Sequence, residues 1–269
     1  MNSTRRKLAK VLIASILALS AANATAITPA ADPVRSDPAA SPAQPLSPEA
    51  KTVLDRMTAY LNALRSFSID TKSTRDEVMA NGFKLQHQEQ SQMVVQFPNK
   101  MRVDVSGDLQ LRTFVYDGAM LGMYSPEQQV FVRTAAPDSV RKLIGGLLDA
   151  GIELPMMDML YQGANGSLTE AVRGGVLVGE TTIDGIACDH LAFRQDNADW
   201  QLWVERGDHP LPRKLLITTR NEVGDPQFEA TMAWNLKPAI TEGTFVFSPP
   251  PGAREIPFTT PVAITGSAQ

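Results

Sequence analysis

Apolar and polar positions alternate along most of this chain, which is the pattern of strands that turn one face to a core. Turn pairs such as Asn81-Gly82, Asp117-Gly118 and Asp184-Gly185 separate the alternating segments and suit two-residue hairpins, because their residues tolerate positive φ. We therefore expect about a dozen strands in an antiparallel meander. The expected strands span residues 66–80, 83–97, 100–106, 109–116, 119–124, 129–134, 176–182, 186–194, 200–205, 213–220, 227–236 and 244–247.

A helical pattern precedes the first strand. Ser47-Pro48-Glu49 combines an N-cap residue, a proline suited to the first helical position and an acidic residue in the first turn. Apolar residues then recur at helical spacing from Val53 to Leu64. The pattern predicts a helix over residues 48–64 that packs on a sheet.

A second helical pattern runs from Asp138 to about Tyr161, with Leu143 and Leu147 on its apolar face and Pro155 interrupting it. Glycines within the helix and a group of methionines after it make the segment adaptable: Gly145, Gly146, Met156, Met157 and Met159. Two interpretations remain open. The segment is either a helical cap on the core or a lid whose glycines hinge and whose methionines adapt to varied ligands.

The run from Asp199 to Thr218 predicts one hairpin that is apolar on both faces. Because side chains alternate along a strand, Trp200 and Leu202 share one face and Trp203 lies on the other. On the return strand, Leu215 and Ile217 point to one face and Leu216 to the other. Helices can cover one such face, and the other needs a second sheet, barrel closure or a ligand. A partly closed antiparallel barrel with a cavity plugged by helices meets that need.

The N-terminus predicts export. Basic residues precede a short apolar run, Val11 to Ala22, and small residues follow it, as in a cleavable signal peptide over residues 1–26. Residues 27–47 are rich in Pro, Ala and Ser and predict a disordered linker. We expect a single domain over residues 48–258, a flexible tail over 259–269 and a periplasmic location.

Composition limits the possible partners and chemistry. Four of the 25 Lys and Arg lie in the predicted signal, which leaves 21 against 29 Asp and Glu, so the mature chain is acidic and a poor binder of nucleic acid. Its one cysteine, Cys188, cannot form an internal disulfide. The sequence contains no HExxH zinc motif, GxSxG elbow or P-loop. We expect neither a cofactor nor a metal.

Cys188-Asp189-His190 is the best candidate for chemistry. In a strand, Cys188 and His190 share a face, where a thiolate and an imidazole could lie together. A buried structural thiol and a hydrogen-bonded histidine explain the same spacing without chemistry. His209, between Asp208 and Pro210, is expected to be an exposed loop residue.

Several segments together resemble a known family: the export signal, the helix-first order, the meander, the hairpin DWQLWVERGDHPLPRK, the segment IELPMMDMLY and the closing FVFSPPPGA. The chain is similar to an uncharacterised family, a domain of unknown function, of predicted periplasmic proteins. The arrangement also resembles the lipoprotein-carrier (LolA/LolB-like) superfamily. This resemblance implies a mainly β (α+β) fold, a curved antiparallel half-barrel of about eleven strands with an N-terminal helix and a central helical plug.

The resemblance further implies a hydrophobic cavity for acyl chains. The chain lacks a lipid-attachment cysteine after its signal, so a soluble carrier or sensor is the nearer analogue. We expect a non-catalytic periplasmic protein that binds lipid, acyl chains or acylated protein, as a carrier, chaperone or envelope sensor. The alternatives are a protein-interaction module with a self-filled cavity, which would bind an envelope protein, and a Cys188-dependent enzyme. The candidate cavity residues are Phe114, Tyr116, Leu143, Leu147, Met156, Met157, Leu160, Trp200, Trp203 and Trp234.

Overall fold

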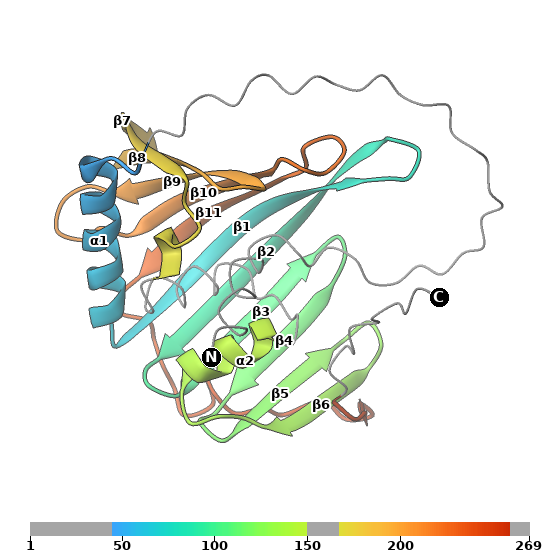
Figure 1. The fold of residues 1–269 in the computed structure, drawn as a ribbon. Helices are drawn as coiled ribbons and strands as arrows, with labels where there is room; N and C mark the ends of the chain where they lie inside the picture. Colours follow the sequence, from blue (N-terminus) through green and yellow to red (C-terminus); the bar gives the residue numbers. More distant parts are fainter. Residues whose placement is uncertain (1–44, 150–166, 259–269) are drawn as a thin grey trace, which may run out of the picture.

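A computed structural model describes residues 45–149 and 167–258 (Figure 1). The predicted signal peptide, most of the predicted linker and the predicted C-terminal tail lie outside the described residues. Met156, Met157 and Leu160 lie outside them as well.

Twelve strands of the described residues form one open sheet in the order β12-β6-β5-β4-β3-β2-β1-β11-β10-β9-β8-β7. The pairs from β1 to β11 are antiparallel, and the two-residue β12 pairs parallel with β6. The strands are β1 Ser66–Val78, β2 Lys84–Gln96, β3 Lys100–Gly107, β4 Leu111–Tyr116, β5 Met120–Ser125, β6 Val130–Ala135, β7 Gly174–Ile183, β8 Ile186–Arg194, β9 Ala198–Glu205, β10 Pro212–Thr219, β11 Gln227–Asn235 and β12 Arg254–Glu255.

Two meanders make up this sheet, and β1 joins them. Strands β1 to β6 pair in chain order, as do β7 to β11, and β1 also pairs with β11 from Ser68 opposite Asn235 to Arg75 opposite Phe228. This confirms the predicted mainly β class and the antiparallel sheet with few helices. The long strands β1 and β2 lie in the middle of the sheet in Figure 1.

Helix α1 (Pro48–Ala63) begins where the sequence predicts, because Ser47 Oγ accepts a hydrogen bond of 3.2 Å from the backbone N–H of Ala50. Helix α2 (Val140–Asp149) is the described part of the second predicted helix. A short 3-10 turn, η2 (Ser167–Thr169), follows. Both α-helices lie on one side of the sheet (Figure 1), and their buried residues belong to one hydrophobic core with the strands. Within the described residues, no helix is long and apolar enough to cross a membrane.

The two faces of the sheet differ in chemistry. We call the face under α1 and α2 the inner face, and its strand residues include Ile69, Met93, Val103 and Leu202, each at most 1% exposed. Alternate residues on the same strands form the outer face, which is mostly polar. The apolar side chains of one face and both helices therefore form the core.

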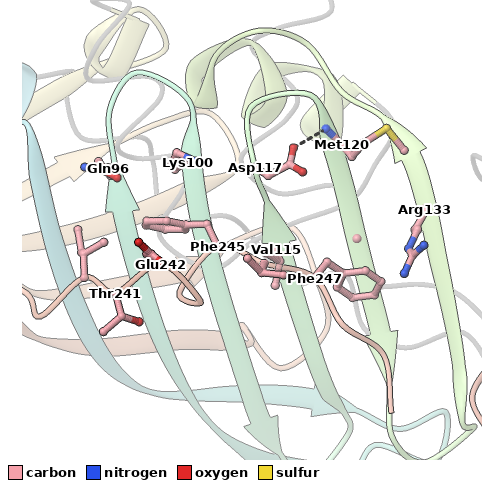
Figure 2. A pocket seen from close by; sticks show the side chains of 13 residues that line it. Gln96, Lys100, Val115, Asp117, Met120, Arg133, Thr241, Glu242, Phe245 and Phe247 are labelled. Atoms are coloured by element: carbon pink, nitrogen blue, oxygen red, sulfur yellow. Dashed lines mark hydrogen bonds between the residues drawn. The ribbon is translucent and has the colours of Figure 1, made fainter. Parts of the chain in front are cut away.

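The strand predicted over residues 244–247 is wrong. Residues 242–245 instead form turns. The backbone N–H of Thr244 donates to the carbonyl of Thr241, and the N–H of Val246 donates to the carbonyl of Gly243. The segment crosses the outer face of β3–β5, and Phe245 and Phe247 pack onto the sheet there (Figure 2). The alternating aromatic residues of this segment pack on a sheet face. A segment that covers a sheet and a segment that pairs as a strand show the same alternation, so the sequence pattern alone does not distinguish them.

Candidate functional site

The inner face brings six of the predicted cavity residues into one apolar wall. Phe114 and Tyr116 come from β4 and Trp200 from β9, while Leu143 and Leu147 of α2 pack against the same core and Trp234 of β11 lies at its margin. The hydroxyl of Tyr116 donates to the carbonyl of Pro137, which ties the start of the α2 region to β4. Burial raises the pKa of Tyr116, and the nearby carboxylates of Asp138 and Asp117 add to the shift, so this hydroxyl stays a neutral donor.

Trp200 carries an unpartnered polar atom into this wall. Its ring stacks on Phe193 of β8 with centroids 4.0 Å apart, and the side chain is only 7% exposed. Its indole Nε1 and the amide Nε2 of Gln195 are buried N–H donors, and neither has a hydrogen-bond partner among the described residues. A buried donor without an acceptor costs about 1–3 kcal/mol, so both positions favour an acceptor oxygen.

Trp234 differs from Trp200 in having its polar atom satisfied. Its Nε1 donates to the carbonyl of Pro212 at 2.8 Å, and its ring lies 5.2 Å from that of Phe67. These contacts connect the indole, on β11, to Pro212 of β10 and Phe67 of β1. Trp234 therefore has a structural role at the margin of the wall.

Sequence analysis missed a change of polarity along the inner face of β1 and β2. Phe67 and Ile69 are followed on this face by the buried Thr71 and Ser73, and Ser91 of β2 lies directly opposite Thr71. Further along, the charged residues of the same face include Glu77, which accepts a 2.9 Å hydrogen bond from His87. The sequence signal for this change was that no large apolar residue follows Ile69 on the inner face of β1. The inner face therefore changes from apolar to polar along β1.

Trp203 lies on the outer face and is separated from Trp200 by the sheet. It pairs with His190 of β8, and the two rings stack 4.3 Å apart and within 8° of parallel. The ammonium of Lys214 lies 5.3 Å from its ring centroid, and His190 Nε2 lies 2.9 Å from the Gln201 amide oxygen. His190 and Lys214 flank Trp203 on the outer face, so Trp203 is not part of the inner wall that contains Trp200.

Cys188 is a buried thiol on this outer face. Burial raises its pKa above the ordinary value, and the thiol lies 3.4 Å from the carbonyl oxygen of Ile186, its acceptor. His190 is engaged by Trp203 and Gln201. The geometry therefore supports the structural interpretation of Cys188 and His190, because a neutral thiol is a weak nucleophile. Among the residues in the described part of the chain, no three His, Cys, Asp or Glu side chains gather as a metal site.

His209 is exposed, as its place in the β9–β10 connection predicts. Its ring meets that of Tyr60 of α1 edge to face at 5.7 Å. This contact links the hairpin to the helix.

A protein-family model described as "Predicted periplasmic protein (DUF2092)" matches residues 50–259, most of the chain. The chain belongs to the DUF2092 family. The match covers both meanders, α2 and all but the first two residues of α1, and it confirms the predicted membership of an uncharacterised family of predicted periplasmic proteins.

Solved structures with similar folds share little sequence with this DUF2092 protein. An uncharacterised conserved protein from Thermus thermophilus is 13% identical, with 78% of this chain and 99% of that chain covered and a TM-score of 0.45. The Mycobacterium tuberculosis lipoprotein LppX is 13% identical over 72% and 99% of the two chains, with a TM-score of 0.46. A putative outer membrane lipoprotein-sorting protein domain from Vibrio parahaemolyticus is 10% identical over 71% and 94%, with a TM-score of 0.31. No curated protein matches the chain.

Proposed function

We propose that this DUF2092 protein is a non-catalytic binding protein that is exported by a cleaved signal peptide to the periplasm. It holds lipid, an acyl chain or a lipid-modified polypeptide against the inner face of its sheet, as a carrier, chaperone or envelope sensor. The apolar wall of Phe114, Trp200 and their neighbours takes the acyl chain, and the binding force is burial, about 0.8 kcal/mol for each CH2 removed from water.

The observation that carries this proposal is the buried, unpartnered indole donor of Trp200 in the wall. The Nε1 of Trp200 lacks an acceptor among the described residues, although it belongs to the apolar core. The buried Nε2 of Gln195, in the connection between β8 and β9, lacks one as well. A carboxylate, ester or amide oxygen attached to an acyl chain supplies an acceptor and an apolar body together. An amphiphile therefore suits both parts of the wall, whereas a purely polar ligand suits only the donors.

Contact quenching by a dibrominated stearate tests the proposal, because bromine quenches only an indole that it touches. The test protein keeps Trp200 alone through Trp203→Phe and Trp234→Phe. The matched control keeps Trp203 alone through Trp200→Phe and Trp234→Phe, which leaves one indole on the outer face. We expect saturable quenching of the Trp200 protein below the micelle concentration and none in the control.

Equal quenching of the two proteins would contradict binding on the inner face, and absence of quenching in both would contradict acyl binding altogether. Circular dichroism of both variants checks that they are folded. The protein-interaction alternative then gains weight, because side chains of α1 and α2 already pack into the core formed by the inner face. Under that alternative the cavity is filled by the chain itself and an envelope protein binds elsewhere.

A further inference from the structure

A pocket of about 600 Å³ lies on the outer face, on the far side of the sheet from α1 and α2. Its floor is formed by outward side chains of β3 to β6, with Val115 at the centre, and the segment 240–247 forms its other wall (Figure 2). Val115 is only 2% exposed and Phe245 only 5%. The volume falls within the roughly 300–1,000 Å³ range of small-molecule sites, and the centre of the floor, at Val115, is apolar.

Arg133 lies at one end of this pocket, and its guanidinium packs on two aromatic rings. The guanidinium carbon lies 5.3 Å from the ring centroid of Phe131 and 5.6 Å from that of Phe247. Arg133 forms no ion pair with any residue that the structure describes. Because aromatic faces use none of the N–H donors in the guanidinium plane, this side chain can donate to an anion in a bidentate manner.

Lys100 is a second cation of the pocket. Its ammonium lies 5.9 Å from the ring centroid of Phe245, and it too has no ion pair among residues 45–149 and 167–258. The neighbouring carboxylate of Asp117 is already engaged, because it accepts hydrogen bonds from the backbone N–H groups of Ala119 at 2.9 Å and Met120 at 2.8 Å. Asp117 and Glu242 repel an anion from their part of the pocket, whereas Figure 2 places Arg133 at the opposite end from Glu242.

We propose that this outer pocket binds a small amphiphilic anion, a carboxylate or phosphate monoester on a short apolar body. The anionic group lies at the Arg133 guanidinium, and the apolar body lies over Val115 between the rings of Phe245 and Phe247. The site is separate from the inner wall, so it stands or falls independently of the proposed function. Carboxylate and phosphate share the planar oxygen pair that a guanidinium recognises.

Calorimetric titration of the mature chain with octyl phosphate, octanoate and neutral octanol tests the proposal. We expect saturable binding of one or both anions, and octanol to bind at least about tenfold more weakly, since it lacks the charge-assisted hydrogen bonds. Arg133→Gln should weaken anion binding by a similar factor. Arg133→Lys keeps the positive charge but loses the pair of parallel N–H donors. Its affinity for the anions should therefore lie between those of the wild type and Arg133→Gln.

Arg112→Gln is the matched control, because Arg112 is an exposed arginine of β4 on the inner face, opposite to the pocket. Its binding should equal that of the wild type. Tryptophan fluorescence gives a second readout: all three tryptophans lie on β9 and β11, away from the pocket, so binding there leaves emission unchanged. Absence of anion binding, or an equal loss of binding in the two glutamine variants, would overturn the proposal.

Discussion

Gly122 of β5 controls how the C-terminal segment packs on the sheet, and adding one methyl group there should detach it. A Cβ at Gly122 would lie 2.1 Å from Cγ of Phe247 and 2.4 and 2.5 Å from its two Cδ atoms. Carbon atoms attract best at about 3.5–4.0 Å, so the ring would have to move by more than about 1 Å. Phe247 also packs on Phe131 at a centroid distance of 6.0 Å, so moving its ring disturbs this pair as well.

We expect Gly122→Ala to lower the free energy of unfolding by about 1–3 kcal/mol, the usual cost of overpacking. Phe247→Ala should cost about 1–2 kcal/mol, less than a fully buried phenylalanine, because this ring is only partly buried. The double variant should cost about as much as Phe247→Ala alone, since the clash is then gone. Urea denaturation followed by far-ultraviolet circular dichroism measures all three values.

Gly146→Ala in α2 is the matched control, because a Cβ there meets no heavy atom within 4 Å. In a helix this change should stabilise by about 0.5–1 kcal/mol. The reasoning is refuted if Gly122→Ala unfolds at the urea concentration of the wild type. It is also refuted if the two single costs simply add in the double variant, since the clash would then not involve Phe247.

Three further predictions concern stability and reactivity. Trp234→Phe should lower the free energy of unfolding by about 1–2 kcal/mol, because its 2.8 Å hydrogen bond is lost. Trp200→Phe should lower it by less, because the Trp200 indole N–H has no acceptor among the described residues to lose. Urea denaturation measures both values, and equal losses would contradict the prediction. Burial alone would raise the pKa of Asp76, but Lys84 and the backbone N–H of Gln227 outweigh it and hold the pKa below its usual value. The resulting stability is present above the unfolded pKa of about 3.9 and is lost as pH falls through the folded value, so the deficit of Asp76→Asn should shrink on acidification and a constant deficit would contradict it. Because burial raises the pKa of Cys188, iodoacetamide should label it at neutral pH only in denaturant, and rapid labelling of the native protein would disprove its burial as a neutral thiol.

Local chemistry made much of the fold predictable from sequence. The N-cap at Ser47 and the turn glycines, such as Gly118 and Gly185 with positive φ, determine where elements begin and where the chain reverses. The start of α1 and most strand limits were therefore predicted to within a few residues. That Trp200 and Leu202 share a face, opposite Trp203, was predictable for a similar reason, because alternation groups residues by face.

What covers each face of the sheet could not be predicted from such patterns. Alternation separates Trp200 from Trp203 but does not tell which of them faces the helices, and an aromatic residue on the outer face can be covered by His190 and Lys214 without a second sheet. The buried donor of Trp200, on which the proposed function rests, likewise depends on neighbours from other strands. These are contacts between residues far apart in the chain.

The sequence by itself determined the hairpins, the helix start and the separation of residues into two faces, because turn residues, caps and alternation act over a few neighbouring residues. Only the tertiary structure decided that β1 joins both meanders through β11 and that the segment around Phe245 and Phe247 crosses the outer face. Both arrangements depend on packing between distant segments. Apolar residues require burial but do not specify the partner that buries them, so the partner is settled only when the whole chain is folded.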